Sequence, residues 1–202
     1  IALWSITERR AINSKVVQEP THGVYPFFEA NTDVLLIVNG TGITLYDPES
    51  LTEKEDQLFV RNSSAGYWTQ LSDDGKLVTL TADAIVLYDL LSKHRMVETF
   101  QPYPEISSQL VRLNWSKAGD MFVTYSLQGS ELGIWNSQNR QLIKFLSEEG
   151  TVSAAAFSNN GDYLLSISDE GIRLWETTDW ELLAGPVTLE ASAFTIEFSP
   201  QD

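Results

Sequence analysis

The chain has 202 residues, a formal net charge of −15 and no cysteine, and 43% of its residues are hydrophobic. A chain of this length and composition can bury one ordinary core. Its acidity argues against sequence-independent nucleic-acid binding, which needs Lys and Arg to neutralise phosphates, and it disfavours docking on anionic membranes. The lack of cysteine excludes disulfides, thiolate nucleophiles and cysteine zinc sites. No stretch approaches the roughly 20 apolar residues of a membrane span.

One short motif recurs from the first residue onward: an aliphatic residue, any residue, a second aliphatic residue and then Trp or Tyr. Its five copies end at Trp4, Tyr46, Tyr88, Trp135 and Trp175. The aromatic position therefore returns roughly every 42 residues, which is the period of a propeller blade. Apolar alternation over so few residues is typical of a strand.

A second motif keeps step with the first. It is a hydrophobic strand that ends in a bulky residue and is followed by a polar turn. The bulky residues are Phe28, Leu71, Trp115, Phe157 and Phe198. The clearest turns end at Gly75, Gly119 and Gly161, since glycine readily takes the positive φ of a tight hairpin. Even spacing within each strand predicts that the bulky side chains point into a core.

Between these two motifs lies another short β-type run, and a weaker run follows the aromatic residue, as at 95–100 and 141–146. Each unit thus contains four short antiparallel strands. This pattern predicts an all-β fold, a β-propeller of four-stranded antiparallel blades with about five blades covered. We treat 1–202 as a single propeller domain or fragment with units at 1–20 (partial), 21–62, 63–105, 106–149, 150–190 and 191–202 (partial). The segments are too short for helical repeats.

The end of each unit resembles the repeat of the WD-repeat family, in which a strand ends in Trp-Asp. The copies here are degenerate, because Trp is followed by Ser5, Asn136 and Glu176, whereas Asp follows only the tyrosines. In that family a His before the first strand bonds to an Asp in the second turn of the blade. Asp83 and Asp169 match that Asp, but the Gly-His pair is missing. We therefore expect the buried His–Asp pair to be absent.

The chain starts on a third strand and stops after a first strand. Two arrangements remain open: part of a larger ring of roughly six to eight blades, or a five-bladed ring that lacks one second strand. A partial ring exposes strand edges, which pair readily with other chains. We therefore expect self-association through open strand edges, or completion of the ring by sequence outside this chain.

Candidate catalytic groups are few. No Gly-x-Ser-x-Gly elbow occurs, and His22 and His94 fall in connecting segments without neighbours at metal-ligand spacing. The acidic clusters, among them Glu148-Glu149, fall in turns and linkers, where we expect water to solvate them. We therefore predict no catalytic residue, no cofactor and no metal site.

The leading interpretation is a non-catalytic scaffold or adaptor that binds a protein partner of unknown identity. The family resemblance implies a partner face near the starts of the first strands, where Tyr25, Trp68 and Arg112 stand on successive blades. Aromatic residues and Arg dominate interface hot spots. The alternative roles are inter-blade packing for the two aromatic residues and a local ion pair for Arg112. Two other functions stay open: a regulatory or sensor propeller attached to a catalytic domain outside this chain, and a propeller enzyme or small-ligand binder that uses the central channel.

Overall fold

The structure is a computed structural model that describes residues 2–5, 10–14, 24–29, 34–39, 42–54, 65–72, 76–81, 85–89, 96–100, 111–190, 193 and 195–199. Strands account for most of these residues. In the first half they are β1 (Ala2–Ser5), β2 (Arg10–Ser14), β3 (Val24–Glu29), β4 (Val34–Asn39), β5 (Gly42–Tyr46), β6 (Ala65–Leu71), β7 (Lys76–Thr81), β8 (Ile85–Asp89) and β9 (Met96–Phe100). In the second half they are β10 (Val111–Trp115), β11 (Met121–Ser126), β12 (Glu131–Asn136), β13 (Leu142–Ser147), β14 (Val152–Phe157), β15 (Tyr163–Ser168), β16 (Gly171–Glu176) and β17 (Leu182–Val187).

The strands form five separate antiparallel sheets, each made of strands that are consecutive in the sequence. Three sheets have four strands, in the orders β6-β7-β8-β9, β10-β11-β12-β13 and β14-β15-β16-β17. A three-stranded sheet, β3-β4-β5, and a two-stranded sheet, β1-β2, precede them. The prediction of an all-β fold built from four-stranded antiparallel blades is confirmed.

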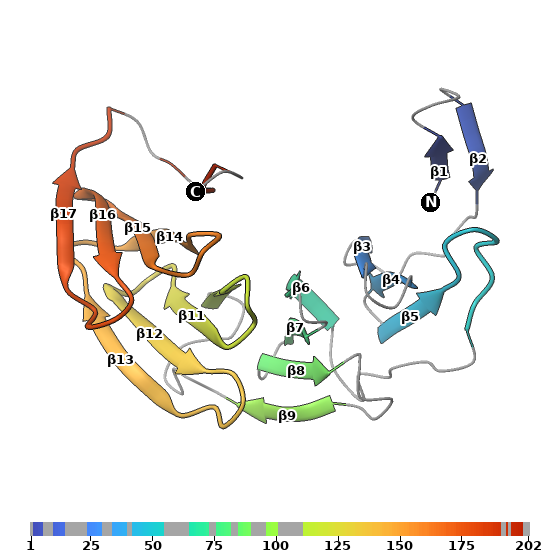
Figure 1. Cartoon of the computed structure of the whole chain (residues 1–202), viewed down its shortest axis with the longest axis horizontal. Helices are drawn as coiled ribbons and strands as arrows, with labels where there is room; N and C mark the ends of the chain where they lie inside the picture. The colour runs from blue at the N-terminus through green and yellow to red at the C-terminus, as the bar shows by residue number, and fades with distance from the viewer. Residues whose placement is uncertain are drawn as a thin grey trace.

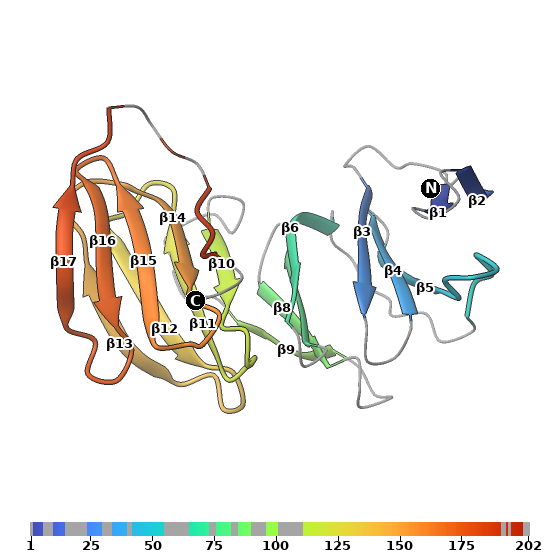
Figure 2. The ribbon, with the colours of Figure 1, turned by 45° about the horizontal axis from the view of Figure 1, so that its top comes forward.

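The sheets follow one another along an open arc (Figure 1). In the four-stranded sheets, β6, β10 and β14 lie on the inner side of the arc, and β9, β13 and β17 lie on its outer side. The turned view in Figure 2 shows the last two sheets side by side, and β14 lies against β10 and β11. Residues 195–199 swing back into the hollow of the arc (Figure 1).

Strand register shows that the two sequence motifs occupy equivalent places in successive blades. Each bulky residue at the end of a first strand is paired with a residue of the second strand, which is paired in turn with the aromatic residue of the third. The rows are Phe28–Leu35–Tyr46, Leu71–Leu77–Tyr88, Trp115–Phe122–Trp135 and Phe157–Leu164–Trp175. The repeat predicted from sequence is therefore a structural repeat.

A β-bulge recurs immediately before the aromatic residue, where the third strand meets the fourth. It falls at Leu3/Trp4, Leu87/Tyr88, Ile134/Trp135 and Leu174/Trp175. A bulge adds one residue to a strand and increases its local twist. Trp4 shares this feature, so β1 and β2 are the third and fourth strands of a unit, as the sequence predicts.

The core lies between blades. Its best described part joins the β10–β13 and β14–β17 sheets, with Val123, Ile134 and Leu146 on one side and Leu164 and Trp175 on the other. Val123, Ile134 and Leu164 are completely buried. Burying an aliphatic side chain of this size contributes about 1.5–3 kcal/mol, so blade stacking is a main source of stability. In the described ranges, no helix has the length and apolar character needed to cross a membrane.

Two units differ from the expected four strands. In the second unit, the fourth strand is reduced, among the described residues, to an isolated bridge between Tyr46 and Glu53. At the other end, the sequence predicts a first strand from Phe194 onward, but residues 195–199 form no strand. A strand needs a hydrogen-bonded neighbour, and the described residues contain no second strand paired with this segment.

Candidate functional site

A groove of about 740 Å³ runs along the inner strands, where three blades and residues 195–198 meet. Its walls come from the ends of β6, β10 and β14 and from the turns that follow. Its polar lining consists of Gln70, Ser72, Asn114, Ser116, Lys117, Ser158, Asn159, Thr195 and Glu197. Its apolar lining consists of Trp115, Tyr125, Ala154, Ala156, Phe157, Ile196 and Phe198. The groove is therefore rich in neutral hydrogen-bonding groups.

Serine follows the bulky residue of each inner strand in the groove, at Ser72, Ser116 and Ser158, and all three are buried. The Ser116 hydroxyl donates to Asp120 Oδ1 at 2.7 Å and accepts from the Met121 backbone N–H at 3.1 Å. Ser158 repeats this arrangement within its own turn. The hydroxyls of Ser116 and Ser158 thus close the first turn of each blade, because they satisfy a backbone donor that would otherwise lack a partner.

An amide ladder links three blades at the wall of the groove. The Gln70 side chain on β6 donates to Asn114 Oδ1 on β10, and Asn114 Nδ2 donates to the Ala155 carbonyl oxygen on β14. Asn114 uses both ends of its amide in this way, as a partly buried amide requires. The ladder fixes the spacing of the inner strands and hence the width of the groove.

Tyr125 contributes to the groove lining and is almost completely buried. Burial raises the pKa of its hydroxyl to about 12, although the Arg112 charge and a hydrogen bond from the Ala155 backbone oppose the shift. Removing water disfavours the phenolate more than the neutral phenol. Tyr125 therefore remains neutral at physiological pH.

The predicted partner face, Tyr25, Trp68 and Arg112, occupies equivalent positions on three successive first strands. Strand register pairs these residues with Val38, Leu80 and Tyr125, at the same step along each second strand. Arg112 is half-buried, and its Nη1 donates to the Val111 carbonyl oxygen at 2.9 Å. The side chains of Tyr25 and Trp68 lie outside the described part of the structure, so the patch stays a prediction. The same column continues at Ala154 and Thr195, which line the groove.

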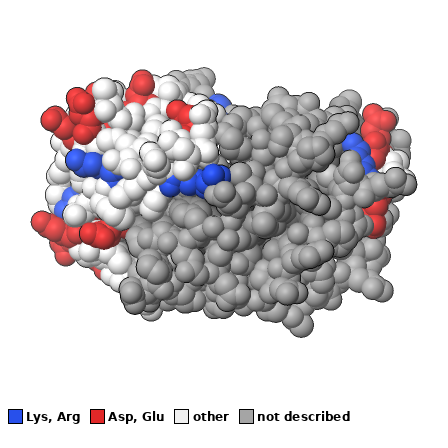
Figure 3. Space-filling model, turned by 90° about the horizontal axis from the view of Figure 1, so that it is seen from below, with Lys and Arg blue, Asp and Glu red and all other residues white. Residues whose placement is uncertain are grey.

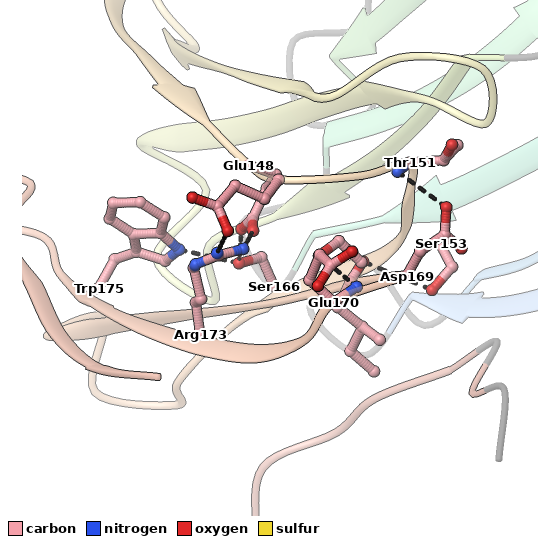
Figure 4. A network of polar contacts seen from close by, with 11 residues as sticks. Glu148, Thr151, Ser153, Ser166, Asp169, Glu170, Arg173 and Trp175 are labelled. Atoms are coloured by element: carbon pink, nitrogen blue, oxygen red, sulfur yellow. Dashed lines mark hydrogen bonds and ion pairs between the residues drawn. The ribbon is translucent and has the colours of Figure 1, made fainter. Parts of the chain in front are cut away.

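A buried polar network stands away from the groove, between the last two blades (Figure 4). Trp175 Nε1 donates to Ser166 Oγ at 2.8 Å, and the Ser166 hydroxyl donates to Glu148 Oε1. Arg173 Nη1 donates to the other oxygen of Glu148. The Glu148 side chain is 0% exposed, and the Arg173 side chain is 6% exposed. The Glu148 carboxylate is sealed from solvent, so the network joins the last two blades.

The same network corrects one sequence expectation. The solvated-surface reading of the Glu148-Glu149 cluster is wrong for Glu148, whereas the Glu149 side chain is 80% exposed. The Glu148 backbone N–H donates to the Ser130 carbonyl oxygen at 2.7 Å, which ties the end of β13 to the turn before β12. A carboxylate buried there needs a cation, and Arg173 supplies it from the third strand.

The second turn of the last blade is tied to the loop that enters it. Asp169 Oδ2 accepts from the Thr151 backbone N–H at 3.0 Å, and the Asp169 backbone N–H donates to the Thr151 carbonyl oxygen (Figure 4). Asp169 is the residue that the family resemblance singles out in this turn. His22 and His94 lie outside the described residues. Among the described residues, no three potential metal ligands are grouped together.

Surface charge is mixed on the face seen in Figure 3. Acidic side chains gather towards the rim of the described blades, and a short row of basic side chains crosses the face between them. Nucleic-acid binding needs a broad basic surface. The expectation of no nucleic-acid partner stays a prediction.

Comparison with known proteins places the fold. No family model matches the chain, and no curated protein matches it. Among solved structures, Hsv2 of Kluyvelomyces marxianus, a yeast β-propeller protein, superposes with a TM-score of 0.65 over 87% of this chain at 16% sequence identity. The chain spans 55% of the length of Hsv2. Such a likeness carries no function from one protein to the other. It does agree with the sheet topology and with the repeated strand register. The chain therefore has a β-propeller fold.

Proposed function

We propose that this chain is a non-catalytic propeller scaffold of the WD-repeat type, which holds a protein partner in the groove along its inner strands. The groove supports the proposal because it spans three blades and combines neutral hydrogen-bonding groups with apolar ones. A polypeptide segment offers the same combination, with backbone amides alternating with side chains. The recurring aromatic position and the period of roughly 42 residues support the WD-repeat assignment.

The chemistry of the lining favours recognition over catalysis. The hydroxyls of Ser116 and Ser158 are engaged within their own turns, where Ser116 donates to the Asp120 carboxylate and Ser158 donates to the Asn160 side chain. Each hydroxyl also accepts a backbone N–H of its turn, so its contacts serve turn closure. Tyr125 is held neutral by burial, so it cannot act as a base near pH 7. Phosphate recognition has little support, because Lys117 is the single basic residue among the described residues that line the groove.

The proposal is tested by filling the groove. Ala156 is half-buried and lines the groove, so Ala156→Arg would occupy the space that a partner needs. Gln138→Arg, in the exposed turn after β12, adds the same side chain away from the groove. Proteins captured by the wild-type chain and by Gln138→Arg, but lost with a folded Ala156→Arg variant, are the expected result in affinity purification with mass spectrometry. Identical protein sets for all three would refute the proposal.

A further inference from the structure

Two exposed turns in the last two blades each contain an asparagine whose side chain folds back on the main chain. Asn160 Oδ1 accepts from the Asp162 backbone N–H at 3.1 Å, and Asn139 Oδ1 accepts from the Gln141 backbone N–H at 3.0 Å. In each turn the side-chain amide also donates to the side chain two residues on, at 2.8 Å from Asn160 and 3.4 Å from Asn139. Both asparagines are exposed to solvent. The two sites therefore have closely matched local geometry.

The residue that follows the asparagine distinguishes the two sites. Gly161 follows Asn160, and a Cβ added to it would meet no atom within 4 Å. Arg140 follows Asn139 and carries its side chain in the left-handed region, at φ 58°. The N–H of the following residue donates to a backbone carbonyl in both turns, at 3.1 Å for Gly161 and 2.8 Å for Arg140, so this contact does not separate the sites. The Gly161 nitrogen is thus the less hindered of the two, because glycine has no side chain beside it.

Hydrogen bonds at the Asn160 side chain favour attack on its carbonyl carbon. The Ser158 hydroxyl donates to Asn160 Oδ1 at 2.7 Å, so this oxygen accepts a second hydrogen bond besides that from Asp162. Two donors aimed at a carbonyl oxygen stabilise the negative charge that develops there when a nucleophile adds to the carbon. Within the described residues, Asn139 Oδ1 accepts only from Gln141.

We propose that Asn160 is a site of spontaneous deamidation, at which the chain modifies itself without an enzyme. The Gly161 backbone nitrogen loses its proton to hydroxide or water and attacks Asn160 Cγ. A bond between Cγ and the Gly161 nitrogen forms, the Cγ–Nδ2 bond breaks, and ammonia leaves with one proton taken from solvent. The resulting cyclic imide adds one water molecule at either of its carbonyl groups. It opens to aspartate or to isoaspartate, according to which carbonyl group reacts.

The product changes a turn beside the groove. Ser158 and Asn159, which directly precede the modified residue, line the groove. A carboxylate at position 160 cannot donate to Asp162 Oδ2, so a hydrogen bond of 2.8 Å becomes a contact between like charges. Isoaspartate also lengthens the main chain of the turn by a methylene group. The inference goes beyond the scaffold function, because the reaction needs no partner and takes place whether or not the groove binds one.

Peptide mapping by mass spectrometry tests the proposal on the whole chain, incubated in mildly alkaline buffer. Asn139 and Asn160 fall in different tryptic peptides, because Lys144 lies between them. Deamidation is measured as the gain in mass when the side-chain NH₂ is replaced by OH, and an isoaspartyl methyltransferase assay identifies isoaspartate. We expect Asn160 to react at least about tenfold faster than Asn139, with both products formed. Gly161→Ala should lower the rate at Asn160 to that at Asn139, and circular dichroism would show that this variant is folded.

Three outcomes would overturn the proposal. Equal rates at Asn160 and Asn139 in the wild-type chain would show that the glycine and the Ser158 hydroxyl give no advantage. An Asn160 that reacts only after the chain is unfolded in urea would show that the folded turn protects it. An unchanged rate in a folded Gly161→Ala variant would show that access to the backbone nitrogen does not control the reaction.

Discussion

The buried carboxylate of Glu148 offers the sharpest test of how the blades are held together. Glu148→Gln keeps the shape of the side chain but leaves the Arg173 guanidinium with Glu149 as its remaining acidic partner, at 3.4 Å. Removing one member of a buried ion pair costs about 3–5 kcal/mol, because the other charge stays buried. Glu149 is well exposed and screened by solvent, so it compensates by no more than about 1 kcal/mol. We therefore expect a net loss of about 3 kcal/mol in the free energy of unfolding.

For a domain of this size, a loss of about 3 kcal/mol lowers the Tm by roughly 6–12 °C. Urea denaturation followed by circular dichroism measures the free energy directly. Glu149→Gln is the control, with an expected loss below about 1 kcal/mol. Arg173→Met alone should also be strongly destabilising, because it leaves the Glu148 carboxylate buried without its cation. The double variant, Glu148→Gln with Arg173→Met, should lose less than the sum of the two, with a coupling of about 2 kcal/mol.

The reasoning would be refuted if Glu148→Gln were no more destabilising than Glu149→Gln. Additive losses in the double variant would also refute it, since they would mean that the two side chains stabilise the fold independently.

Two further predictions concern the same pair of blades. Because burial raises the pKa of Tyr125 to about 12 from 10.0, the folded state holds this proton more tightly than the unfolded state does. The free energy of unfolding should therefore fall by roughly 2–3 kcal/mol between about pH 10 and pH 12. Tyr125→Phe should remove this fall when stability is measured against pH in alkaline denaturation. An unchanged dependence of stability on pH in the variant would count against Tyr125 as its source. Gly133→Ala should cost about 1–3 kcal/mol in thermal unfolding, because its Cβ would meet Trp135 Nε1 at 2.7 Å and Thr124 Oγ1 at 3.0 Å. At Gly161, φ is +80° and an added Cβ would meet no atom within 4 Å, so Gly161→Ala should cost about 1 kcal/mol. A larger loss of stability for Gly161→Ala than for Gly133→Ala would contradict the steric explanation.

The fold was predictable from sequence because blade stacking imposes a period on the residues. Trp115 and Phe157 end inner strands, and Trp135 and Trp175 lie in the corresponding rows of the third strands, as the spacing predicts. The positive φ of Gly119 and Gly161 is likewise as expected for the first turn. Such features depend on local alternation and turn chemistry, which the sequence states directly.

The polar interior was not predictable in the same way. Glu148 lies in a connection rich in acidic residues, and composition favours a solvated position there. Its burial depends on Arg173, which is 25 residues away in sequence. One pattern could have pointed to the pair: Arg173 alternates with Trp175 on a strand, so it shares the face that packs against another blade. A charged residue on such a face needs a partner of opposite charge.

The groove was missed for a related reason. Its lining comes from the ends of three inner strands and from residues 195–198, none of which forms a motif alone. The serine that follows the bulky residue at positions 72, 116 and 158 was the sequence pattern that marked these strand ends. This pattern indicates how the turns are closed, but it does not indicate the width of the space between blades.

The amide ladder has a mechanical consequence. Asn114 accepts from one neighbouring blade and donates to the other, so the middle blade cannot loosen without breaking contacts on both sides. Under a stretching force applied to the chain ends, these three blades should yield together in a single event. Independent hairpins joined by linkers would instead give way one after another.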